Sequence, residues 1–117
     1  MIPLPFPGDD ATTLSAVETV VLEPGQKATV EFTPEQSGTR VYLPAVAVSK
    51  HPTTHYRIKG DSNTLWDAAI PPTDIDDLSA PWIPVRSFST SLEVEVAYLA
   101  ESGGAREYHI QPVGWEQ

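Results

Sequence analysis

Residues 17–32 read VETVVLEPGQKATVEF, in which two β-rich runs flank the turn sequence Glu-Pro-Gly-Gln. Pro24 presets φ at about −65° and Gly25 tolerates a positive φ, which is the combination that a type II turn needs. After the turn, apolar residues alternate with polar ones, so one face of this strand is expected to be buried and the other wet. The stretch therefore predicts an opening hairpin, with strands at 16–23 and 26–33.

The same alternation returns at residues 91–99, SLEVEVAYL. Glu93 and Glu95 are expected on the wet face of this strand. Its apolar residues are expected to point into the core: Leu92, Val94, Val96 and Tyr98. Other β-rich runs separated by turn residues predict further strands: 39–49, 54–60, 105–115 and a short one from Thr64.

Pro44 lies inside the third predicted strand. The expected core residues before it, Val41 and Leu43, have one parity. Those after it, Val46 and Val48, have the other. A proline combined with a change of parity predicts a β-bulge or a kink, because proline cannot donate to a central ladder.

The chain has 117 residues, enough for one domain with one core. Its twelve prolines and seven glycines fit many short strands joined by turns. We predict an all-β fold, an antiparallel β-sandwich, Ig-like or jelly-roll-like, of about six to eight strands. One sandwich domain is expected at 11–117, with a long loop at 69–84, and an extended Pro-rich N-terminal arm at 1–10.

Acidic residues outnumber Lys and Arg by 16 to 7, which gives a formal net charge of −9. Such a surface repels phosphates, so neither nucleic acid nor an anionic membrane is an expected partner. The acidity has two interpretations. It provides solubility, or it is a halophilic adaptation in which high salt screens the self-repulsion of the chain.

Cysteine is absent, so disulfides and thiolate chemistry are not expected. No apolar run approaches the roughly 20 residues that a membrane-spanning helix needs. The N-terminus, MIPLPFPGDD, lacks the basic and continuous apolar regions of a secretory signal. The chain is therefore expected to be made in the cytoplasm and used without further processing.

Two groups of residues are of the types that bind metal ions. His51 and His55 have a zinc-like spacing, but Pro52 and the strand that follows keep them from sharing a helix face. No metal site is predicted there.

The acidic run in the long loop, Asp74, Asp76 and Asp77, has the oxygen ligands that a hard cation prefers. It lacks the EF-hand pattern and suits a solvated turn that starts a helix, capped by Thr73. Whether this run binds a cation stays open.

Catalytic signatures are missing from the chain: it has no G-x-S-x-G, no G-x-G-x-x-G, no P-loop and no cysteine. Glu93 and Glu95 lie about 7 Å apart on one strand face, a separation comparable to that of glycosidase carboxylates. Nothing else in the sequence supports that use. We expect neither an enzyme nor a cofactor.

The arm and the long loop are the predicted contact elements. Three prolines in the arm favour an extended segment, and its apolar residues require burial on their own domain or on a neighbouring copy. The loop is stiffened by proline and carries apolar side chains, which is typical of a contact element. The candidate interface residues are Leu4, Phe6, Pro71, Pro72, Ile75 and Trp82.

Tryptophan offers a different use of the surface. Trp66, Trp82 and Trp115 can stack on sugar rings, or they can anchor a core or an interface. Trp82 lies between prolines at the end of the long loop and is interpreted as an interface anchor.

An acidic cysteine-free β chain, an apolar arm and the loop PPTDIDDLSAPWIPVRSF before a long strand together resemble small virion structural proteins of haloarchaeal tailed viruses. The resemblance is to the capsid-decorating, turret and tail-associated β-sandwich subunits of these viruses. The segment VVLEPGQKATVEFTP is similar to the opening of many Ig-like modules. The resemblance covers the chain in style and carries no residue-level signature. It implies a virion component that is assembled in the host cytoplasm.

Two functions compete on these grounds. The first is a non-enzymatic structural subunit of a large assembly, whose partners are copies of itself and other structural proteins of that assembly. The second is a binding module that recognises a cell-surface glycan or receptor through its tryptophans and acidic loop.

Overall fold

The computed structural model describes residues 12–14, 16–36, 38–76 and 85–117. Within these ranges the chain forms strands and no helix. The ten strands are β1 (Thr12–Thr13), β2 (Glu18–Leu22), β3 (Lys27–Phe32), β4 (Val41–Val48), β5 (Thr54–Gly60), β6 (Asn63–Ala68), β7 (Thr73–Asp74), β8 (Arg86–Phe88), β9 (Leu92–Tyr98) and β10 (Arg106–Glu116).

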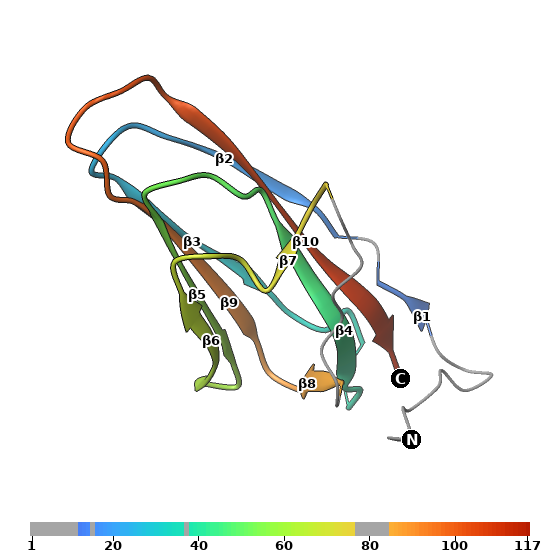
Figure 1. The fold of residues 1–117 in the computed structure, drawn as a ribbon. Coiled ribbons are helices and arrows are strands. Elements are labelled where there is room, and N and C mark those ends of the chain that lie inside the picture. The colour runs from blue at the N-terminus through green and yellow to red at the C-terminus, as the bar shows by residue number, and fades with distance from the viewer. Residues whose placement is uncertain (1–11, 15, 37, 77–84) are drawn as a thin grey trace, which may run out of the picture.

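The strands form two sheets that pack face to face (Figure 1). The first sheet contains β1, β2, β4, β7, β8 and β10, and the second runs in the order β3-β9-β5-β6. The predicted β-sandwich is confirmed. Ten strands exceed the expected six to eight because β1, β7 and β8 have only two or three residues each, too short to leave an alternation pattern. One pair, β4 with β7, is parallel.

Alternating side chains from both sheets build one core. Along β9 the predicted inward residues are buried at 0–2% exposure: Leu92, Val94, Val96 and Tyr98. From β5, Tyr56 and Ile58 lie in the same cluster as Val46 and Val48 of the opposite sheet. The buried strand faces that period-two alternation predicts are therefore confirmed.

The predicted opening hairpin is wrong in its pairing. The turn itself has the expected geometry, since Gly25 has φ +83° and the Gln26 N–H donates to the Glu23 C=O at 3.1 Å. However, β2 pairs with β10 in the first sheet, whereas β3 pairs with β9 in the second. The turn is an arch between the sheets, held at the end of β9 by the Gly25 N–H, which donates to the Tyr98 C=O at 2.8 Å.

The predicted bulge at Pro44 is confirmed. The register of β4 against β10 shifts between Val113 and Trp115, so that Leu43 and Pro44 together face the single residue Gly114. The core face changes parity across this bulge, as the sequence pattern indicated. Gly114 allows the close approach, because a Cβ at this position would lie 1.8 Å from the Tyr42 carbonyl oxygen.

The long loop at 69–84 is more structured at its start than predicted. Thr73 does not cap a helix there, because it lies in β7 and pairs with Ala47 of β4. Asp74 takes the capping role for the following turn, since its Oδ1 accepts the Asp76 N–H at 3.1 Å. Residues 77–84 lie outside the described residues.

Candidate functional site

One edge of the first sheet is the best candidate for a contact surface. β1 and β2 run along β10 in one continuous register, since Thr12 faces Glu116 and, six residues on, Glu18 faces Ile110. Among the described residues, β2 pairs with β10 alone, so its other side is open. We call residues 17–22 the β2 edge.

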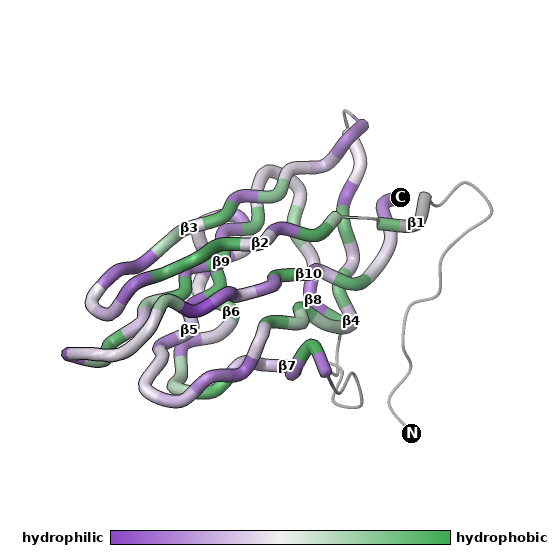
Figure 2. Tube along the Cα trace, turned by 90° about the horizontal axis from the view of Figure 1, so that it is seen from above, coloured by the Kyte–Doolittle hydropathy of each residue, from purple (hydrophilic) through white to green (hydrophobic). Residues whose placement is uncertain are grey.

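The β2 edge is apolar on its outer face. Val21 is 64% exposed and Val17, just before the strand, is 60% exposed. Figure 2 shows the hydrophobic colour along much of β2. Val20 and Leu22 on the inner face pack against the core, so this short strand is apolar on both faces.

The backbone N–H and C=O groups on the open side of the β2 edge are oriented to pair with another strand. In antiparallel pairs, successive residues direct their N–H and C=O groups to alternate sides. The Leu14 N–H donates to the Gly114 C=O at 3.0 Å, so in this register the even-numbered residues face β10. On β10, the His109 C=O accepts the Ser49 N–H and faces away from β2. The odd-numbered residues that face the open side are Val17, Thr19 and Val21.

The edge strand β3 carries more charge than the β2 edge, since it presents Lys27 and Glu31 to solvent. The edge strand β6 presents one charge, Asp67. Natural edge strands avoid aggregation with lysine, proline, bulges or covering loops. The β2 edge has no lysine or proline, and Glu18 is its single charge. It is therefore open to strand addition.

The outer face of the second sheet carries a ladder of opposite charges. Arg57 on β5 lies in register between Glu95 on β9 and Asp67 on β6. Its Nε lies 3.5 Å from the Asp67 Oδ2, and His55 contacts the other oxygen of that carboxylate. The hydrogen bond from His55 is the main cause that lowers the pKa of Asp67, with the charge of Arg57 adding to it.

A small open hollow lies on this charged face. It measures about 70 Å³ and is lined by Thr29, Arg57, Lys59, Glu93 and Glu95. Ligand pockets are typically about 300–1,000 Å³ and mostly apolar. The hollow is too small to enclose a sugar ring.

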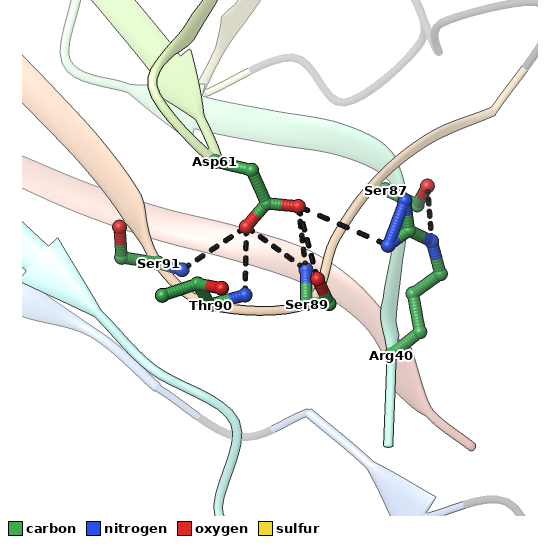
Figure 3. A network of polar contacts seen from close by, with 6 residues as sticks. All are labelled: Arg40, Asp61, Ser87, Ser89, Thr90 and Ser91. Carbon is green, nitrogen blue, oxygen red and sulfur yellow. Dashed lines mark hydrogen bonds and ion pairs between the residues drawn. The ribbon is translucent and has the colours of Figure 1, made fainter. Parts of the chain in front are cut away.

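Asp61 is a hydrogen-bond hub that closes one end of the sandwich (Figure 3). It stands in the two-residue turn between β5 and β6, and its carboxylate accepts the backbone N–H groups of Ser89, Thr90 and Ser91 at 2.7–3.3 Å. The guanidinium of Arg40 lies 3.8 Å from its Oδ2. Partial burial alone would raise the pKa of Asp61, but the backbone donors outweigh it and hold the pKa below 3.8.

Glu116 is a second hub, at the end of β10. Its side chain is buried at 4% exposure and accepts the N–H groups of Glu35 and Gln36 at 3.1 and 2.8 Å. The Thr39 hydroxyl also donates to it. This hydroxyl is the largest of the causes that hold the pKa of Glu116 below its ordinary value of 4.5. The carboxylate ties the connection before β4 to the end of β10.

These two hubs predict a loss of stability in acid. Both carboxyl groups have lower pKa values in the folded chain than in the unfolded chain. Their contribution to the free energy of unfolding is therefore complete above about pH 4.5 and is lost as the pH falls through the folded pKa values. The melting temperature should fall steeply between pH 4.5 and 2, as measured by circular dichroism. The melting temperature of the variant Glu116→Gln should fall less steeply with decreasing pH. An unchanged pH dependence would contradict the role assigned to Glu116.

The structure separates several predicted site residues. Pro71 is buried, Pro72 and Ile75 are half-buried, and the Ile75 N–H donates to the Val48 C=O at 3.1 Å, so this part of the loop packs on its own domain. Leu4, Phe6 and Trp82 lie outside the described residues, and their contacts stay predictions.

The two described tryptophans do not form a joint sugar platform. Trp66 lies in the second sheet, packs against the core and donates its Nε1–H to the Ile70 C=O at 2.8 Å. Trp115 lies in the first sheet, where its ring stacks on Tyr42 at 5.6 Å between centroids. Its buried Nε1 has no hydrogen-bond partner among the residues that the structure describes.

The histidines also lie apart. His51 contacts the Glu107 carbonyl, His55 contacts Asp67 in the second sheet, and His109 contacts Thr19 in the first. In the part of the chain that the structure describes, no group of three or more His, Asp or Glu residues is arranged to hold a metal ion.

The sequence interpretation missed the β2 edge because it paired β2 with β3. One signal was present: Val20, Val21 and Leu22 are consecutive apolar residues that break the alternation. Such a run is typical of a strand with apolar side chains on both faces.

No known protein family matches this chain, and neither a curated protein nor a solved structure shows significant similarity to it. Across the described residues there is no helix that is long and apolar enough to cross a membrane.

Proposed function

We propose that this protein is a non-enzymatic structural subunit of a large assembly and acts through contacts between copies of itself. The observation that carries the proposal is the β2 edge, whose side away from β10 has no partner strand among the described residues and which carries the exposed Val17 and Val21 without lysine or proline. An edge of this kind is a template for pairing with another chain.

The assembly we propose is a virion, with the chain as a capsid-decorating, turret or tail-associated component built in the host cytoplasm. The resemblance of the acidic, arm-bearing β chain to haloarchaeal virion subunits supports this choice. Its net charge of −9 fits an assembly that works at high salt, where copies can approach one another.

The second candidate, a glycan- or receptor-binding module, has weaker support. The hollow on the second sheet is about 70 Å³, well below a typical ligand site, and Trp66 and Trp115 lie in different sheets. The charged ladder around it suits a solvated sheet face.

Mass measurement by analytical ultracentrifugation at about 0.1 and 2 M salt tests the proposal, since this range shortens the Debye length several-fold. We expect oligomers that increase with salt and protein concentration. A monomer under all conditions would refute the assembly role, and a monomer retained on a glycan array would establish the binding module instead.

Removal of residues 1–8 is expected to weaken self-association and leave the sandwich folded. Burial of Leu4 and Phe6 stabilises by roughly 1.5–3 kcal/mol each. A neighbouring copy is one of the two places that the sequence leaves open for them, and it is the one proposed here. Ultracentrifugation and thermal melting of the truncated chain would measure the two effects separately. Unfolding of the truncated chain would mean that the arm belongs to its own core.

A further inference from the structure

We infer that the β2 edge pairs antiparallel with the β2 edge of a second copy around a twofold axis that passes beside Thr19, which joins the first sheets of the two copies. This inference rests on the proposed function, because it names the partner and the geometry of one assembly contact. A twofold contact of this kind closes on itself and yields a dimer, so larger arrays need further contacts.

The backbone supports the pairing. The N–H and C=O groups of the odd-numbered residues of the β2 edge face the open side. In an antiparallel pair centred on Thr19, odd-numbered residues face odd-numbered residues, so each of these groups meets a complementary group. Two copies can therefore form the alternating hydrogen bonds of a regular ladder.

The side chains select this register among its neighbours. When Thr19 faces the partner's Thr19, the exposed Val17 faces the partner's Val21, and the reciprocal pair forms on the other side of the axis. Glu18 then faces the partner's Val20. Both exposed valines of each copy are covered, and no two carboxylates face each other.

The two neighbouring registers are worse. A pair centred on Glu18 places two carboxylates opposite each other, which destabilises a sheet. A pair centred on Val20 places Val17 against the partner's Glu23 and leaves Val21 against the partner's Thr19. Of these three registers, only the pair centred on Thr19 places both exposed valines, Val17 and Val21, opposite valines of the partner.

Charge and size set the conditions for the dimer. β2 has five residues, so the strand pair is short. The interface therefore belongs to the class of small, weak protein–protein interfaces. Each copy carries −9, so the dimer should form mainly at high protein concentration and in molar salt.

A lysine at the edge tests the contact. Val21→Lys should raise the dimer dissociation constant at least about tenfold, as truncation of a central contact does. The matched control is Leu99→Lys, because Leu99 is 60% exposed outside the β2 edge. Both variants reduce the net negative charge equally, so weaker association of Val21→Lys alone cannot come from charge repulsion. Melting curves confirm that both variants are folded.

A crosslinking experiment tests the register. Since the chain has no cysteine, Thr19→Cys introduces one thiol per copy, with Cα atoms about 5.5 Å apart across the axis. A short bismaleimide should convert this variant to covalent dimer in molar salt. Thr64→Cys, exposed on the edge strand β6 of the second sheet, should remain monomeric on denaturing gels.

The outcomes separate this inference from the proposed function. If the wild type self-associates while Val21→Lys behaves as Leu99→Lys does, or if Thr64→Cys crosslinks and Thr19→Cys does not, the β2 pairing is overturned and the assembly role stands. If the wild type is monomeric at every salt and protein concentration, both are overturned.

Discussion

Gly114→Ala is expected to destabilise the fold by about 3 kcal/mol, at the upper end of the cost of overpacking. A Cβ at this position would lie 1.8 Å from the Tyr42 carbonyl oxygen and 3.3 Å from the Leu43 Cα. These are backbone atoms inside the bulge between β4 and β10, so no side-chain rotation can relieve the clash. For a domain of this size, the melting temperature should drop by roughly 10 °C.

Gly104→Ala is the matched control. A Cβ at Gly104 meets no atom within 4 Å, and its backbone does not require a positive φ. This variant should therefore melt within a few degrees of the wild type. Equal melting temperatures for Gly114→Ala and Gly104→Ala would show that the bulge adjusts freely, and would contradict the close approach.

Asp61→Ala is expected to cost about 2–3 kcal/mol. The change removes the charged acceptor of the backbone N–H groups of Ser89, Thr90 and Ser91, and hydrogen bonds to a charged group contribute about 1.5–3 kcal/mol. Asp61 also has φ +51°, a conformation that aspartate tolerates better than alanine does. Urea unfolding monitored by fluorescence would measure the loss.

Asp61→Asn separates the two causes. Asparagine keeps the tolerance of a positive φ and one carbonyl acceptor but carries no charge. We expect a smaller loss of stability than for Asp61→Ala. The melting temperature should also fall less steeply with decreasing pH, because one of the two titrating carboxylates is gone. If Asp61→Ala unfolds at the same urea concentration as the wild type, the hub does not hold this end of the sandwich.

The sequence alone determined the longer strands and their buried faces. Strand β5 was predicted at its observed bounds, 54–60, and the inward residues of β9 were predicted from alternation. Pro44 and the parity change around it indicated the bulge. These features are local, because period-two alternation, proline and turn glycines act through the residue itself and its nearest neighbours.

The sequence predicted the residues of the candidate site only in part. Pro71, Pro72 and Ile75 were chosen as interface residues for their stiffness and apolarity, yet the structure packs this region on β4 through the Ile75 N–H and the short strand β7. A buried apolar residue and an interface residue look alike in sequence, since both avoid water. The Asp61 hub was not predicted, because its donors are backbone groups 28–30 residues away.

Only the tertiary structure decided which strands are neighbours. The turn at Glu23–Gln26 formed as predicted, but β2 joined β10, more than 80 residues away, and β3 joined β9. A turn sets the direction of the chain, while the choice of partner depends on how all strands together cover the core and satisfy their backbone groups. That choice placed Val17, Thr19 and Val21 at an open edge, because the sheet ends where no further strand of the described chain remains to pair with β2.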